Sequence, residues 1–120
     1  MSRHDPKVTL LQIRDFALKA QSFCQGKTLP DIVRDWRDTL AFERALELVG
    51  EAVKRLPVDL RDRYPAVSWK NFAGLRDRVS HGYENVDYQI LWDTVQNDLP
   101  RLLRTVEQML RDLEPPSSNS

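Results

Sequence analysis

The stretch DYQILWDTVQNDLPRLLRTVEQMLRDL, from Asp87 to Leu113, decides the fold class. Its apolar residues recur at steps of three and four, which places them on one face of an α-helix. Asp87 is a favourable N-cap residue for such a helix. Pro100 lies inside the pattern, so we expect a kink in one helix or two abutting helices. The stripe consists of Tyr88, Leu91, Val95, Leu99, Leu102, Val106, Met109 and Leu113.

A second helical stretch is expected near the N-terminus. Asp5 suits the N-cap and Pro6 the first helical position, while Gly26 permits a left-handed stop at the other end. Because Cys24 falls on the apolar face, we expect a buried structural thiol rather than a nucleophile. This face consists of Ile13, Phe16, Ala17, Ala20, Phe23 and Cys24.

The middle of the chain adds further helices. A short helix is expected over 28–36, a longer one from Asp38 or Thr39 through Leu56, and a single turn or short helix over 58–65. The apolar stripe of the longer helix is Phe42, Ala45, Leu46, Val49, Ala52, Val53 and Leu56. Since no segment shows a convincing period of two, the sequence predicts an all-α fold, an antiparallel bundle of about four to five helices.

Composition is that of one globular domain. The chain has 120 residues, 41% apolar and 30% charged, with 18 Lys+Arg balanced by 18 Asp+Glu. We expect a single domain over 5–114, with flexible tails at 1–4 and 115–120. The single cysteine excludes an intramolecular disulfide and a cysteine-based metal site. The first residues lack a signal peptide's apolar run, and no run reaches the roughly 20 residues of a spanning helix, so a cytoplasmic location without membrane contact is expected.

The segment SWKNFAGLRDRVSHGYENVD, from Ser68 to Asp87, holds the residues that favour chemistry. Ser68 is a good N-cap, so a helix is expected from there to about His81, with Gly82 as its stop. His81 is the sole histidine outside the N-terminal tail. In the last helical turn the helix dipole favours its protonated form.

The neighbours of His81 allow two interpretations. On a regular helix Asp77 and Arg78 share the face of His81, so Asp77 can orient the imidazole, whereas Arg76 points about 140° away. With Tyr83 exposed beyond the stop, these residues can form an acid–base site, completed by a second copy across a dimer axis. Alternatively, His81 caps its helix and Tyr83 packs on the last helix.

Charge is segregated along the chain. Residues 54–78 carry seven basic and three acidic side chains, a net charge of +4, while 84–98 carry four acids and no Lys or Arg, a net charge of −4. The basic stretch suits an anionic ligand such as a phosphodiester, or it is neutralised by the acidic stretch inside the bundle. One histidine in the body of the chain excludes a His-pair metal site. Glu47 and Glu51 suggest paired carboxylates for a metal or, as we prefer, a solvated face.

The run RDRVSHGY, Arg76–Tyr83, fits the R-x4-H-x-Y motif of HepT-like toxins in the HEPN superfamily of helical ribonucleases. Three flanking segments also resemble that family: GEAVKRLP (50–57), RYPAVSWKNFAGLRD (63–77) and YENVDYQILWDTVQNDLP (83–100). The resemblance covers nearly the whole chain apart from its tails.

The resemblance implies a homodimeric, HEPN-like endoribonuclease that needs no metal or other cofactor. It would be the toxin of a type II toxin–antitoxin pair, would cleave mRNA or tRNA, and would be neutralised by a minimal nucleotidyltransferase antitoxin. Arg76 and His81 match the catalytic pair at the dimer cleft, with Asp77 and Arg78 in supporting positions. Tyr83 matches the tyrosine that the antitoxin modifies with AMP.

Two other functions stay open at the level of sequence. The chain can be a non-catalytic nucleotide-binding or substrate-presenting subunit of a nucleotidyltransferase complex, with the motif as docking and modification site. It can also be a purely structural helical bundle. Cleavage of RNA in EDTA, and its loss in His81→Ala, separates the enzyme from both.

Overall fold

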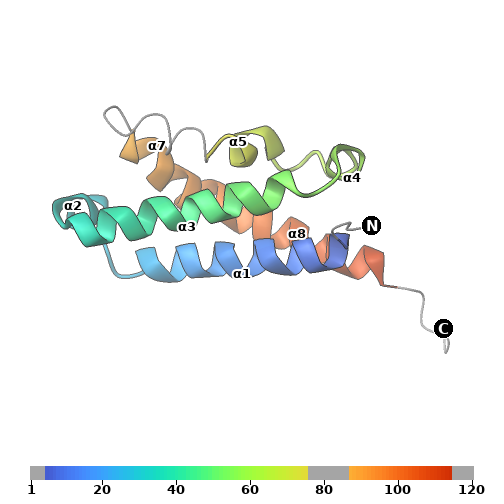
Figure 1. Cartoon of the computed structure of the whole chain (residues 1–120), viewed down its shortest axis with the longest axis horizontal. Helices are drawn as coiled ribbons and strands as arrows, with labels where there is room; N and C mark the ends of the chain where they lie inside the picture. Colours follow the sequence, from blue (N-terminus) through green and yellow to red (C-terminus); the bar gives the residue numbers. More distant parts are fainter. Residues whose placement is uncertain (1–4, 76–86, 115–120) are drawn as a thin grey trace.

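The computed structural model describes residues 5–75 and 87–114, and in these ranges the chain forms helices and no strand. Three long helices dominate: α1 (Pro6–Cys24), α3 (Trp36–Lys54) and α8 (Leu99–Leu113). Helix α1 runs antiparallel to α3 and to α8 (Figure 1). The predicted all-α class is therefore confirmed.

Shorter helices connect and cover the long ones. Helix α2 (Leu29–Arg34) lies at the turn between α1 and α3, and α4 (Val58–Asp62) follows the end of α3 (Figure 1). Helix α5 (Trp69–Ala73) packs on α3, and α7 (Tyr88–Asp93) begins the last helical run. No helix in the described residues is long and apolar enough to cross a bilayer.

The predicted start and stop of the first helix are correct. The Asp5 carboxylate accepts a hydrogen bond from the Lys7 backbone N–H at 2.9 Å, and Pro6 occupies the first turn, where its missing N–H has no partner to lose. Gly26, two residues beyond the helix, has a φ of +78°, a conformation in which a Cβ is strained. It reverses the chain into α2, which Thr28 caps reciprocally with Asp31.

Helix α3 begins three residues earlier than the sequence predicted. Asp35, not Asp38 or Thr39, is the N-cap, and its carboxylate accepts from the Arg37 backbone N–H at 2.9 Å. Thr39 lies inside the helix, where its hydroxyl donates to the carbonyls of Ile32 and Asp35 at 2.9 and 3.0 Å. Three favourable cap residues, Asp35, Asp38 and Thr39, lie close together here, and α3 starts at the first of them, where it packs on α2.

At Pro100 the sequence predicted a kink in one helix or two abutting helices, and the structure has two helices joined by a π-helical segment. Between α7 and α8 the residues Thr94–Asp98 form a wider turn, in which the Leu99 N–H donates to the Thr94 carbonyl five residues back. Pro100 then stands in the first turn of α8, where it needs no backbone donor. The proline is thus accommodated by two abutting helices joined through one π turn.

The expected helix from Ser68 to His81 is interrupted within its described part. Helix α5 ends at Ala73, and Gly74 forms a turn before Leu75 is again helical. Glycine is the weakest helix former apart from proline, which accounts for the break. Ser68 occupies the N-cap position, but its side chain makes no capping hydrogen bond. The remainder of that predicted helix, with Gly82, lies outside the described residues.

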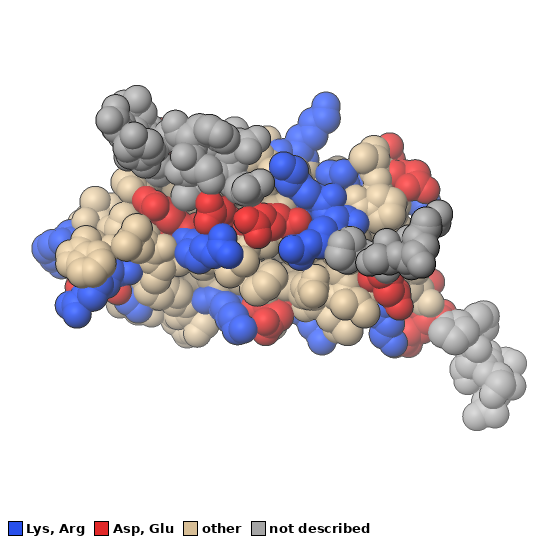
Figure 2. All heavy atoms as spheres, viewed as in Figure 1, with Lys and Arg blue, Asp and Glu red and all other residues tan. Residues whose placement is uncertain are grey.

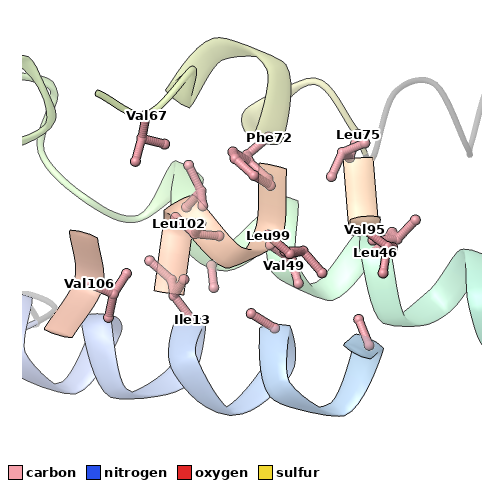
Figure 3. Close-up of a cluster of buried hydrophobic side chains, with 14 of the residues drawn as sticks. Ile13, Leu46, Val49, Val67, Phe72, Leu75, Val95, Leu99, Leu102 and Val106 are labelled. Atoms are coloured by element: carbon pink, nitrogen blue, oxygen red, sulfur yellow. The ribbon is translucent and has the colours of Figure 1, made fainter. Parts of the chain in front are cut away.

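One buried cluster unites the helices. Ile13 of α1, Leu46 and Val49 of α3, and Leu99 and Val106 of the last helical run converge in it (Figure 3). Cys24 is 4% exposed and belongs to this core, and burial raises the pKa of its thiol to about 11. A buried, protonated thiol is a structural residue, as the apolar stripe predicted.

Candidate active site

The five residues predicted to form the site are not among those that the structure describes. Arg76, Asp77, Arg78, His81 and Tyr83 all lie within 76–86, between the two described ranges. Their roles therefore stay predictions. The structure describes Leu75, the last residue before this segment, and Asp87, the first residue after it, together with the residues around them.

The entrance is held by apolar burial. Phe72 of α5 and Leu75 are 2% and 1% exposed, and both point towards the core residues of α3 and the last helical run (Figure 3). The Trp69 indole Nε1–H donates to the Tyr64 carbonyl at 2.9 Å and so fixes the preceding loop to α5. Side chains buried this completely hold the backbone next to Arg76 in one place.

The exit is held by polar contacts. The Asp87 carboxylate caps α7 by accepting from the backbone N–H groups of Gln89 and Ile90 at 3.0 and 3.2 Å. The next residue, Tyr88, donates its hydroxyl proton to Glu43 of α3 at 2.5 Å. Burial and this bond to a carboxylate raise the pKa of Tyr88 to about 12, so the phenol stays protonated at neutral pH.

An acidic row runs along the face of α3 (Figure 2). Glu43, Glu47 and Glu51 succeed one another at steps of four, and Arg44 lies 3.0 Å from Glu47 and 3.6 Å from Glu51. The Glu47 and Glu51 side chains are only 17% and 25% exposed, so the expectation of a solvated face is wrong for them, and Arg44 is a cation that engages both. In the described residues no group of three or more His, Cys, Asp or Glu side chains is placed to hold a metal ion.

The basic stretch is not neutralised within the described ranges. There, Lys54, Arg61, Arg63 and Lys70 form no ion pair. Lys and Arg side chains gather where the end of α3 meets α4 and α5 (Figure 2). For these four residues the alternative of internal salt bridging is wrong, and their charges stay available to an anionic ligand.

The acidic stretch is engaged locally instead. Among its described members, Asp87 caps its own helix and Asp93 accepts from the Gln89 side chain at 2.9 Å. Sequence reasoning placed Tyr88 on the apolar stripe and did not foresee its bond to Glu43, 45 residues away. A tyrosine at the edge of an apolar stripe is the one signal that a buried hydroxyl would need a partner.

The described ranges form an all-helical protein, and the segment that carries the R-x4-H-x-Y motif lies between them in sequence. The family described as ribonuclease HepT-like matches residues 13–109, a range that includes all of Ser68–Asp87. The chain belongs to this family.

Similar proteins agree with that assignment. The protein named "Putative RNase MJ0127", of Methanocaldococcus jannaschii, is 35% identical over 120 residues, which is 100% of this chain and 99% of the relative. "Putative RNase TTE0752", of Caldanaerobacter subterraneus, is 41% identical over 72% of this chain and 78% of its own. "Probable ribonuclease HepT", of Thermococcus cleftensis, is 35% identical over 74% of this chain and 81% of its own. No solved structure matches the chain significantly.

Proposed function

We propose that this protein is a metal-independent endoribonuclease, the toxin of a type II toxin–antitoxin pair, with Arg76 and His81 as its catalytic residues. The observation that carries the proposal is the match to the HepT-like family across the segment that contains R-x4-H-x-Y. The basic side chains that gather where the end of α3 meets α4 and α5 support an anionic substrate.

The residue types suit transesterification of RNA. His81 takes the proton from a ribose 2′-hydroxyl, whose oxygen attacks the adjacent phosphorus while the bond to the 5′-oxygen breaks. Arg76 stabilises the charge that builds on the phosphoryl oxygens, because its planar fork matches phosphate. The products are a 2′,3′-cyclic phosphate and a 5′-hydroxyl.

A dimer completes this chemistry. The departing 5′-oxygen needs a proton, and one imidazole cannot be base and acid in the same step. A cleft on a two-fold axis brings two copies of His81 together, one neutral and one protonated. On a regular helix Arg76 points away from His81 of its own copy. In a cleft shared by two copies, the Arg76 side chain of either copy can then face the substrate.

The catalytic assignment is tested by cleavage of a labelled RNA in EDTA. Wild-type protein is expected to cleave, and His81→Ala and Arg76→Ala to lose at least about a hundredfold in rate, the scale of general acid–base catalysis. Arg37→Ala, at an exposed arginine in the first turn of α3 that is paired with Asp35, is the control and retains activity. Absence of cleavage by wild-type protein that is unmodified at Tyr83 would refute the proposal in favour of a non-catalytic subunit.

Neutralisation by AMP modification is tested separately. We propose that a minimal nucleotidyltransferase joins AMP to the Tyr83 oxygen, with release of pyrophosphate from ATP, and that the added negative charge repels RNA. Mass spectrometry after incubation with ATP and that partner should show one adenylyl group per chain and a loss of cleavage. Tyr83→Phe should cleave RNA and stay unmodified. Modification of Tyr83→Phe to the same extent would contradict this site.

A further inference from the structure

A hollow of about 360 Å³ lies between the loop that follows α4 and the middle of α8. Arg63 and Tyr64 contribute from the loop, and Arg104 and Thr105 from the helix. Tyr64 and Pro65 give it apolar lining. Arg63 and Arg104, which also line it, are both exposed residues. The hollow thus combines an aromatic side chain with two arginines.

The tyrosine in this hollow is held in a fixed position. Its hydroxyl donates to the Asp112 carboxylate at 2.6 Å, and Asp112 also accepts from the Gln108 side chain at 2.7 Å. The Tyr64 backbone carbonyl accepts the Trp69 indole N–H. A ring tied at its hydroxyl and at its backbone is pre-organised as a stacking platform, so little conformational entropy is lost when a planar group binds.

The two arginines of the hollow do not stabilise the described part of the chain through ion pairs. Within the described residues neither Arg63 nor Arg104 forms an ion pair, although other surface arginines such as Arg14 do. Asp112, the acid beside the hollow, is engaged by Tyr64 and Gln108. Guanidinium groups left free beside an aromatic ring match the phosphate and base of a nucleotide, since arginine binds phosphate through two donors.

The hollow is connected to the proposed active site through the chain. Trp69 of α5 fixes the loop 63–68 to α5, and Leu75, two residues beyond α5, directly precedes the segment 76–86. Lys70, exposed on α5, lies between the two in sequence and adds a further unpaired cation. Lys70 thus adds positive charge to the stretch of chain between the hollow and the segment 76–86, as a binding surface for single-stranded RNA requires.

We infer, on the basis that RNA is the substrate as proposed above, that Arg63, Tyr64 and Arg104 form a second RNA-binding site outside the cleavage site. It takes one nucleotide of single-stranded RNA, the base on the Tyr64 ring and the flanking phosphates on the two arginines. The site lengthens the footprint of the enzyme on RNA and favours long single strands over short ones.

Binding is measured with a 2′-O-methyl RNA, which lacks the attacking hydroxyl, by fluorescence anisotropy at several salt concentrations. The double variant Arg63→Gln/Arg104→Gln should raise the Kd roughly tenfold and flatten the slope of log K against log salt by about 1.4, for two lost phosphate contacts. Arg34→Gln/Arg37→Gln, at two exposed arginines beside α2, is the control with the same change in net charge, and should bind as wild type.

The base-stacking role has its own pair of variants. Tyr64→Ala should weaken binding about tenfold, whereas Tyr64→Phe, which keeps the ring and loses only the bond to Asp112, should bind nearly as wild type. Circular dichroism and thermal melting verify that each variant is folded. Equal weakening by both tyrosine variants would overturn the stacking assignment.

Cleavage of a dinucleotide separates this inference from the proposed activity. A dinucleotide has one phosphate, which must occupy the cleavage site, so the double variant should cleave it at the wild-type rate. If wild-type protein cleaves no RNA, loss of 2′-O-methyl RNA binding in the double variant still upholds the second site. The inference is overturned if the double variant binds RNA as wild type does, or if the charge control loses as much affinity. It is also overturned if the double variant loses binding to a polyglutamate peptide but not to RNA.

Discussion

Tyr88 is the residue through which the end of the proposed catalytic segment is joined to α3. Its hydroxyl donates to Glu43, and its ring packs against the core from the first turn of α7. A hydrogen bond to a carboxylate is stronger than one between neutral groups, and here it fixes two helices that are far apart in sequence.

Replacement of Tyr88 by phenylalanine should lower the free energy of unfolding by about 1–2 kcal/mol, because a charge-assisted hydrogen bond is lost while the ring stays. Urea denaturation at pH 7 measures the change. Thr105→Ser, a small change at the surface, is a control expected to stay within about 0.5 kcal/mol of wild type. An unfolding free energy equal to that of wild type would contradict the bond.

The same bond predicts a dependence on alkaline pH. The pKa of Tyr88 is about 12 in the folded protein and about 10 in an unfolded chain, so the folded state holds the proton more tightly. The stabilisation is fully present below pH 10 and is lost as the pH rises through about 12. The decline in this window should be smaller in Tyr88→Phe than in wild type.

At the scale of the element, helix ends explain both the successes and the failures of sequence reasoning. Asp5, Thr28 and Asp87 are caps whose side chains make the expected hydrogen bonds. Ser68 occupies a cap position without making one. A cap residue can be recognised from its type, but whether its oxygen reaches the helix depends on the path of the preceding loop.

This contrast gives a matched pair of variants. Asp87→Ala should cost about 1 kcal/mol, because two backbone N–H groups at the start of α7 lose their acceptor. Ser68→Ala should be nearly neutral, since no capping bond exists there to be lost. Thermal melting of the two proteins checks the difference. A larger loss from Ser68→Ala than from Asp87→Ala would show that the roles are reversed.

At the scale of the whole molecule, the proposed chemistry needs two copies of the chain. Size-exclusion chromatography with light scattering at tens of micromolar should give twice the mass of one chain. The mass should be the same in EDTA, since the proposed site uses no metal. A strict monomer under these conditions would remove the composite site and the two-imidazole mechanism with it.

Much of the fold could be read from local patterns. Apolar residues at helical spacing predicted α1, α3 and α8, because burial of one face is a property of periodicity alone. The same patterns missed the break at Gly74 and placed the start of α3 too late. At Gly74 the weak helix propensity of glycine breaks the helix, whereas at the start of α3 several cap residues compete and the packing of α3 on α2 accompanies the earliest of them.

The sequence by itself determined the all-helical class, most helix ends and the motif that places the chain in its family, because each depends on residues close together in the chain. Only the tertiary structure decided which distant side chains come together: Tyr88 and Glu43 in a hydrogen bond, and Arg63 and Tyr64 with Arg104 in the lining of one hollow. Such meetings depend on how the helices rotate and pack against one another, which local spacing does not specify.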